Sequence, residues 1–192
     1  MFSSCENLKS IEIPSGVERI GSWCFYASKV EEIVFPAALR EIGESAFGYC
    51  KDLKHVTFAP GSRLERIGPE CFCEAGIETI VIPKGIEEIP NNAFEQCASL
   101  KEVAFEEGSR LKVIEEYAFL DCTSLEKIDF PEGLERIEVN CFTNSGLVEV
   151  VLPVSVREVG SWAFECCKKL KSVQLNEGLE KLGAKKIDGH GR

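Results

Sequence analysis

Apolar residues recur along the chain as two short stretches separated by turn residues. In each unit a leading apolar residue is followed by an apolar–polar–apolar stretch, and in five units by proline. Alternation with period two predicts a half-buried β-strand, which proline ends because it lacks the N–H that a sheet needs. The inward-facing pairs of the predicted strands are Ile11/Ile13, Ile33/Phe35, Val56/Phe58, Ile80/Ile82, Val103/Phe105, Ile128/Phe130, Val150/Leu152 and Val173/Leu175.

The pattern is a repeat of about 23 residues. Units start at Leu8, Val30, Leu53, Ile77, Leu100, Leu125, Leu147 and Leu170. A fixed period in this range is typical of a solenoid, in which each unit stacks on its neighbours. We therefore expect one solenoid over residues 1–187. The pattern decays at Lys186 and Ile187, and we expect a disordered tail over residues 188–192.

The 12 phenylalanines and 10 cysteines take regular places in this repeat. Four phenylalanines end predicted strands, and the other eight form one column: Phe2, Phe25, Phe47, Phe72, Phe94, Phe119, Phe142 and Phe164. A cofactor cage needs convergent polar groups, which this column lacks. The column predicts a stacked aromatic spine in the core and no bound cofactor.

Eight cysteines also fall into columns. Five lie three residues after the column phenylalanine, and three lie directly before it. The two placements exclude each other within a unit, so we interpret them as alternative ways to fill one small buried volume. A disulfide remains an alternative, although only Cys97 and Cys122 share a column in consecutive units. We expect no metal site, because zinc needs four convergent ligands.

The phrase Ile-x-Ile-Pro-x-x-Val-x-x-Ile-Gly-x-x-Ala-Phe-x-x-Cys resembles the BspA-like class of leucine-rich repeats. The resemblance covers residues 2–182 and is fullest in 77–97 and 147–167. It implies an α/β-type solenoid, a horseshoe with a parallel β-sheet on the concave face and short strands or helical turns on the convex face. Known members include bacterial and protist surface proteins that engage host or matrix proteins. The resemblance therefore implies protein binding, adhesion and a cell-surface or extracellular location.

The charge balance narrows the partners. With 22 basic and 32 acidic residues, the net charge is −10, which argues against sequence-blind binding to nucleic acid. No run of about 18 apolar residues occurs, so we expect no membrane insertion. The first residues lack the charged start and apolar core of a signal peptide, which favours a cytoplasmic location and an intracellular scaffold as the alternative function. The chain also starts without a polar cap, which indicates either a fragment cut from a longer array or an N-terminal edge that a partner covers, with homo-association as one form of the second.

Much of the charge lies in three columns that we call ladders. Ladder 1 is Lys9, Glu31, Lys54, Glu78, Lys101, Glu126, Val148 and Lys171. Ladder 2 is Glu18, Arg40, Glu65, Glu87, Lys112, Glu135, Arg157 and Glu180, and ladder 3 is Arg19, Glu41, Arg66, Glu88, Val113, Arg136, Glu158 and Lys181. The sign mostly alternates, so stacked units should place opposite charges together and fix the register.

Outward strand residues form the candidate protein-binding site on the expected concave face. They are Glu32, Val34, His55, Thr57, Thr79, Val81, Glu102, Ala104, Lys127, Asp129, Glu149 and Val151. Val34, Thr57, Val81 and Ala104 make a mildly apolar lane, which acidic residues flank. An exposed apolar strip on a repeat scaffold indicates a protein partner, whereas ordinary strand propensity explains the same residues without one.

Catalysis is not expected. His55 is the only histidine outside the C-terminal tail, and it has no paired nucleophile. No glycine-rich phosphate loop occurs. An enzyme based on cysteine or His55 is the remote alternative.

Overall fold

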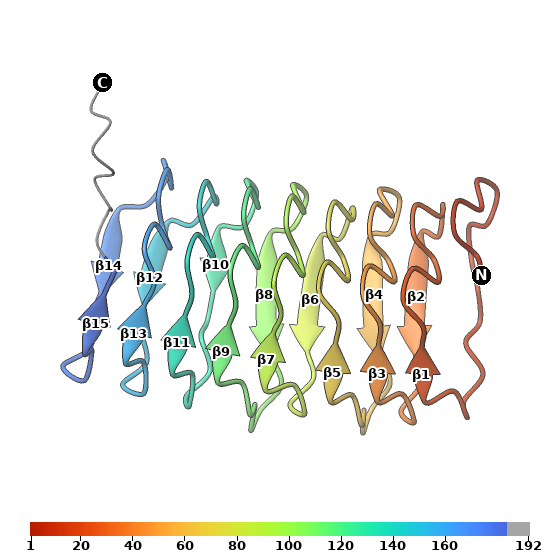
Figure 1. Cartoon of the computed structure of the whole chain (residues 1–192), viewed down its shortest axis with the longest axis horizontal. Helices are drawn as coiled ribbons and strands as arrows, with labels where there is room; N and C mark the ends of the chain where they lie inside the picture. Colours follow the sequence, from red (N-terminus) through yellow and green to blue (C-terminus); the bar gives the residue numbers. More distant parts are fainter. Residues whose placement is uncertain (184–192) are drawn as a thin grey trace.

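The computed structural model describes residues 1–183, so the predicted tail over 188–192 and the unit end at Ile187 lie outside the described residues. The chain winds through stacked coils that stand in one row from the N-terminus to β15 (Figure 1). Each complete coil has a strand on a first side, a two-residue strand on a second side, and tight turns on a third side.

The strands of the first side carry even numbers, and those of the second side carry odd numbers. The first side contains β2 (Glu32–Phe35), β4 (His55–Phe58), β6 (Thr79–Ile82), β8 (Glu102–Phe105), β10 (Lys127–Ile128), β12 (Glu149–Val151) and β14 (Ser172–Gln174). The second side contains β1 (Arg19–Ile20), β3 (Glu41–Ile42), β5 (Arg66–Ile67), β7 (Glu88–Ile89), β9 (Val113–Ile114), β11 (Arg136–Ile137), β13 (Glu158–Val159) and β15 (Lys181–Leu182).

All pairings between neighbouring strands are parallel and keep equivalent residues side by side. Ile33 pairs with Val56, and Ile42 pairs with Ile67. On the first side the order is β2-β4-β6-β8-β10, and β12-β14 forms a separate pair. On the second side the sheet divides between β5 and β7. The repeat period therefore becomes a stacking register, as the sequence predicted.

The predicted α/β character is wrong for residues 1–183, which contain no helix. Two residues of each complete turn side have left-handed backbone, four positions apart, as at Trp23 (φ 60°) and Ala27 (φ 53°). This spacing interrupts the run of right-handed residues that an α-helix requires. The turns instead bond between coils, as where the Phe25 N–H donates to the Ala46 carbonyl at 2.8 Å. Of the two predicted options, short strands or helical turns, the strands are present.

The predicted strand at Ile11 and Ile13 does not form. Its segment lies at the edge of the stack and has a neighbouring coil on one side. There the Lys9 carbonyl accepts a hydrogen bond from the Glu31 N–H at 2.9 Å. Edge position alone does not explain the missing strand, because β14 also has a single neighbour among the described residues, β12, and still forms.

The phenylalanine column is the predicted spine. Its eight rings stack without interruption from Phe2 to Phe164, with centroids 5.0 to 5.6 Å apart. Stacking at this spacing adds to the burial of large apolar side chains. The spine joins the coils into one continuous core.

The cysteine column does more than fill volume. The Cys50 and Cys97 thiols each donate to the carbonyl of a column phenylalanine one coil earlier, Phe25 and Phe72, at 3.0 Å. Cys122 and Cys167 make the same bond at 3.1 Å. Each of these carbonyls also accepts the backbone N–H three residues further on, so the thiol adds a second hydrogen bond to a buried carbonyl.

Candidate protein-binding face

The outward residues of the even-numbered strands lie in two rows, which we call the first-side face. One row runs through Glu32, His55, Thr79, Glu102 and Lys127, which are neighbours in the sheet register. In the other row Val34 pairs with Thr57, and Val81 pairs with Ala104. The structure thus brings these nine predicted residues onto one surface.

The apolar side chains of this face are exposed. Val34 is 58% exposed, Val81 51% and Val151 49%, although their inward neighbours Ile33 and Ile80 are buried. Ala104 is half-buried, and Thr57 is exposed. The free energy falls when a partner covers apolar groups that are otherwise in contact with water.

The other three predicted residues lie where the sheet is interrupted. Lys127 is the first residue of β10, and Asp129 directly follows that strand. The two side chains form an ion pair at 2.5 Å. Glu149 and Val151 belong to β12, which pairs with β14 and not with β10. An open groove of about 460 Å³ lies at this break, and its lining includes Phe130 and Pro153. In the sequence, the charged Lys127 and Asp129 interrupt the apolar lane at this place, but nothing there indicates the groove.

The surroundings of His55 and of two buried thiols, Cys71 and Cys73, do not favour catalysis. His55 lies exposed on β4 between Glu32 and Thr79, which are its register neighbours. Burial raises the pKa of the Cys71 thiol well above its ordinary value and raises that of Cys73 to about 12. A thiol with a raised pKa stays protonated and is a poor nucleophile.

An aromatic cluster that was not predicted from the sequence lies on the turn side. Trp23 and Tyr49 are exposed, and Tyr26 lies between them with ring centroids 4.8 and 5.2 Å away. A hydrogen bond with the Glu74 carboxylate raises the pKa of Tyr49 to about 12. Trp23 shares its repeat slot with Tyr117 and Trp162, which was a signal, but Tyr26 and Tyr49 occupy other slots.

Within residues 1–183, no helix is both long and apolar enough to cross a membrane. Over the same part of the chain, no three His, Cys, Asp or Glu side chains gather as a metal ion would need.

Comparison with models of protein families shows which family the chain belongs to. The model of the BspA type leucine-rich repeat region matches residues 1–101 and 87–189. The chain belongs to this family. The parallel solenoid, the phenylalanine spine and the cysteine column are therefore the structure of BspA-type repeats in this chain, and such a repeat array is a scaffold that suits protein binding.

Two solved leucine-rich repeat proteins support the fold. A leucine-rich repeat protein from Bacteroides ovatus is 30% identical, with a TM-score of 0.66; the match covers 94% of this chain and 52% of that one. A leucine-rich repeat protein of T. pallidum is 26% identical, with a TM-score of 0.58, and the match covers 86% and 73%. This chain thus spans about half the length of the Bacteroides protein. The search of curated proteins finds no match.

Proposed function

We propose that the chain is a protein-binding scaffold whose first-side face contacts the partner, and that it serves in adhesion or in recognition of host or matrix proteins at the cell surface. The observation that carries the proposal is the exposure of Val34, Val81 and Val151 on strands whose inward residues form the core. The surface role extends the family resemblance.

The composition of the face supports a protein ligand. The valines supply apolar area. Glu32 and Glu149 lie on the strands of Val34 and Val151, and Glu102 lies on β8, so the apolar strip has an acidic margin. Interfaces of this kind combine an apolar centre with a polar rim. A complementary partner surface presents apolar side chains bordered by basic ones.

The test compares binding by the wild type and by the V34E/V81E/V151E variant to an array of purified extracellular-matrix proteins. We expect the variant to lose its partners, because three buried carboxylates would oppose docking. The control is Val154→Glu, since Val154 is 72% exposed and lies beyond β12, outside the named face. Equal binding by wild type and the triple variant would refute the first-side face.

A second candidate is an intracellular interaction scaffold. It is favoured by thiols that act as hydrogen-bond donors in the core, such as Cys97 to the Phe72 carbonyl, because reducing compartments preserve thiols. Biotinylation of intact cells with a reagent that does not cross membranes distinguishes the two. Labelling of the protein supports the surface role, and labelling only after lysis supports the intracellular one.

A further inference from the structure

The groove between β10 and β12 lies inside the row of described coils, with β8 beyond one border and β14 beyond the other (Figure 1). β10 pairs with β8, whereas β12 pairs with β14, so the two strands that border the groove do not share a sheet. Its volume of about 460 Å³ is in the range of pockets that enclose a bound group. The groove thus has described coils on both of its sides.

The apolar lining of the groove is held in place by the core. The Phe130 ring is half-buried and meets the Phe142 ring of the spine edge-on, with centroids 5.7 Å apart. Val151 is half exposed on β12, and Pro153 precedes the turn that follows this strand. The lining therefore offers a fixed apolar surface on which an aromatic or branched aliphatic side chain of a partner can pack.

Four of the charged side chains that lie at the groove form two ion pairs within the chain. Lys127 pairs with Asp129 at 2.5 Å, and the hydrogen bond to Asp129 raises the pKa of Lys127. Glu126 pairs with Lys169 at 2.9 Å, across 43 residues of the chain. These pairs neutralise their own charges and add no net charge to the groove.

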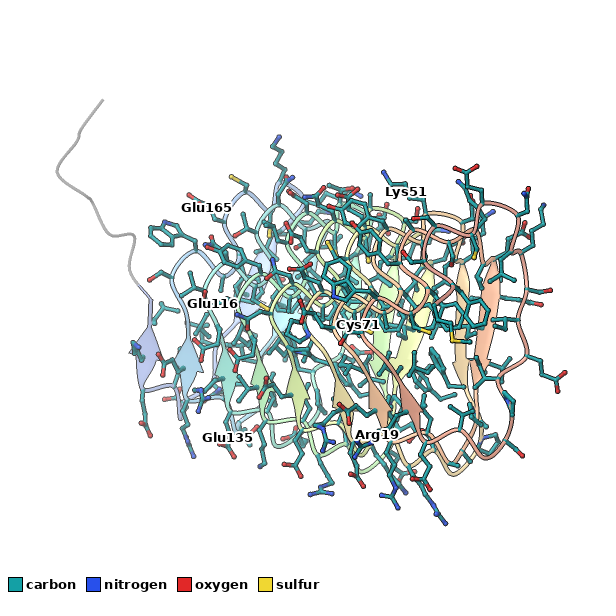
Figure 2. The ribbon with its side chains drawn as sticks, turned by 45° about the vertical axis from the view of Figure 1, so that its right-hand side comes forward. Arg19, Lys51, Cys71, Glu116, Glu135 and Glu165 are labelled. Atoms are coloured by element: carbon teal, nitrogen blue, oxygen red, sulfur yellow. The ribbon has the colours of Figure 1, made fainter. Side chains whose placement is uncertain are left out.

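Glu132 and Glu149 also line the groove, and their charges are not neutralised in this way. Within residues 1–183, neither carboxylate forms an ion pair. Ladder carboxylates mostly have a basic partner in a neighbouring coil, as Glu135 has in Lys112 at 2.9 Å. Figure 2 shows Glu135 and Arg19, a ladder 3 residue, at the lower margin of the molecule, along the side of the odd-numbered strands. The groove thus differs from the ladders in its two uncompensated negative charges.

The positions of these two carboxylates define the charge pattern of a ligand. Glu149 is the first residue of β12, whereas Glu132 lies beyond the end of β10 and after Pro131. They therefore stand toward opposite ends of the groove, with Phe130 and Val151 between them along the strand direction. A ligand that complements this arrangement has an apolar centre and a positive charge on each side of it.

We propose that this groove is the anchor site of the first-side face, and that it binds a partner segment in which an aromatic or branched aliphatic residue stands between two lysine or arginine residues. The inference rests on the proposed function, because it names the chemistry of the partner of that face. The apolar side chain packs on Phe130 and Val151, and the flanking basic residues pair with Glu132 and Glu149. Anchors of this kind, which enter a pocket near charged groups, contribute much of the binding energy of an interface.

The probe is a short peptide, acetyl-Gly-Lys-Phe-Lys-Gly-amide, which is titrated into the isotope-labelled protein and followed by NMR. The backbone amide signals of Phe130 and Val151 should move until they saturate, whereas those of β4 and β6 should stay in place. In one control peptide serine replaces phenylalanine, and in the other glutamate replaces both lysines. Each control should bind at least about tenfold more weakly, because it lacks either the apolar anchor or the complementary charge.

A matched pair of lysine substitutions tests the apolar part of the groove. Val151→Lys places a positive charge in the groove and should weaken binding of the basic peptide at least about tenfold. Val81→Lys is the control, because Val81 takes the same repeat slot on β6 and is 51% exposed, against 49% for Val151. This control should change the affinity by less than about twofold.

A matched pair of double substitutions tests the charges. E132Q/E149Q should weaken binding by a factor of about three to ten and should remove most of its salt dependence, because the two ion pairs are lost. E32Q/E102Q removes the same net charge from the same face outside the groove, so its effect should stay within about twofold. This comparison separates pairing in the groove from general attraction to an acidic protein. Circular dichroism checks that each variant is folded.

The proposal is overturned if Val81→Lys weakens binding as much as Val151→Lys, if the two glutamine variants behave alike, or if the serine peptide binds as well as the phenylalanine peptide. Groove signals that move on dilution of the protein alone would also overturn it, in favour of a second copy as the occupant.

Binding to the matrix proteins separates this inference from the proposed function. If V34E/V81E/V151E loses its partners but Val151→Lys keeps them, the first-side face stands and the anchor groove fails. If the triple variant keeps its partners, the face itself fails.

Discussion

The two strand faces of the solenoid cover one core but present different surfaces. On the first side, the row of Val34, Thr57, Val81 and Ala104 is uncharged. On the second side, the outward positions are the charged residues of ladder 3, and ladder 2 lies directly before them. There Arg66 and Arg19 both approach Glu41, at 2.9 and 3.6 Å.

The difference shows how a repeat array divides its tasks. Charges that pair between coils penalise a slipped register, so the second side specifies stacking. Each exposed pair contributes only about 0.2–1 kcal/mol, so its effect is more on specificity than on stability. Among residues 1–183, the first side carries one ion pair between its two rows of outward residues, Lys127 with Asp129, and its valines are exposed. Ladder 1, directly before these strands, also pairs between coils, as Lys101 does with Glu78 at 2.9 Å.

The largest expected effect comes from the spine that both faces share. Phe119 is fully buried, with neighbouring rings 5.1 Å away on each side. Phe119→Ala should lower the free energy of unfolding by about 3–5 kcal/mol, and Phe119→Leu by less. Urea unfolding followed by circular dichroism and tryptophan fluorescence measures the loss. A loss below about 1 kcal/mol for the alanine variant would contradict a major contribution of the stacked rings to stability.

A smaller loss is expected at Gly68, which follows β5 on the second side. A methyl group there would lie 2.6 Å from the carbonyl carbon of Gly43 and against the backbone of Glu44. Gly68→Ala should therefore destabilise the protein by about 1–3 kcal/mol, as overpacking does. Gly16→Ala is the control, because nothing lies within 4 Å of its position. Similar urea midpoints for the two variants would show that the coils can move apart.

The cysteine column should give the next effect. Cys97→Ala removes one of two hydrogen bonds to the Phe72 carbonyl, which still accepts the Ala75 N–H at 3.0 Å, and should lower the free energy of unfolding by about 0.5–1.5 kcal/mol. Cys97→Ser keeps a donor and should lose less. Chemical denaturation of both variants in parallel checks the order. An alanine variant at least as stable as the serine variant would mean that the thiol only fills space.

Much of this architecture was predictable from the sequence, because it depends on periodicity. The units, the spine from Phe2 to Phe164 and the ladders all follow from the spacing of residue types. The turn side was not predictable in the same way. Its left-handed residues are of many types, among them Trp23, Tyr117 and Asn140, so residue type does not predict where φ is positive. The break beside β10 also depends on pairing between coils, which a single strand sequence does not encode.

Charge substitutions on the two faces should differ in their effect on the free energy of unfolding by a few tenths of a kcal/mol. Arg66→Glu places like charges beside Glu41, so the melting temperature should fall at low salt and recover at high salt. Val81→Lys, a new charge on the first side, should change the melting temperature little under either condition, because its side chain is already half exposed. Calorimetry at two salt concentrations makes the comparison. A stronger salt dependence for the valine variant would reverse the assignment of roles.

The smallest effect concerns two glutamates of the second side with opposite pKa shifts. A hydrogen bond and charge interaction with Lys112 lower the pKa of Glu135, so its ionised form stabilises the fold above the ordinary carboxyl pKa, and this is lost as pH falls through the lowered value. Burial, and then repulsion from Glu88, raise the pKa of Glu115, so its contribution is favourable at low pH and lost as pH rises through the raised value. At about pH 7, Glu135→Gln should lower the melting temperature and Glu115→Gln should raise it, and both differences should shrink toward about pH 3. Shifts of the same sign at pH 7 would mean that Glu115 is as well accommodated as a paired ladder residue, which its place between carboxylates opposes.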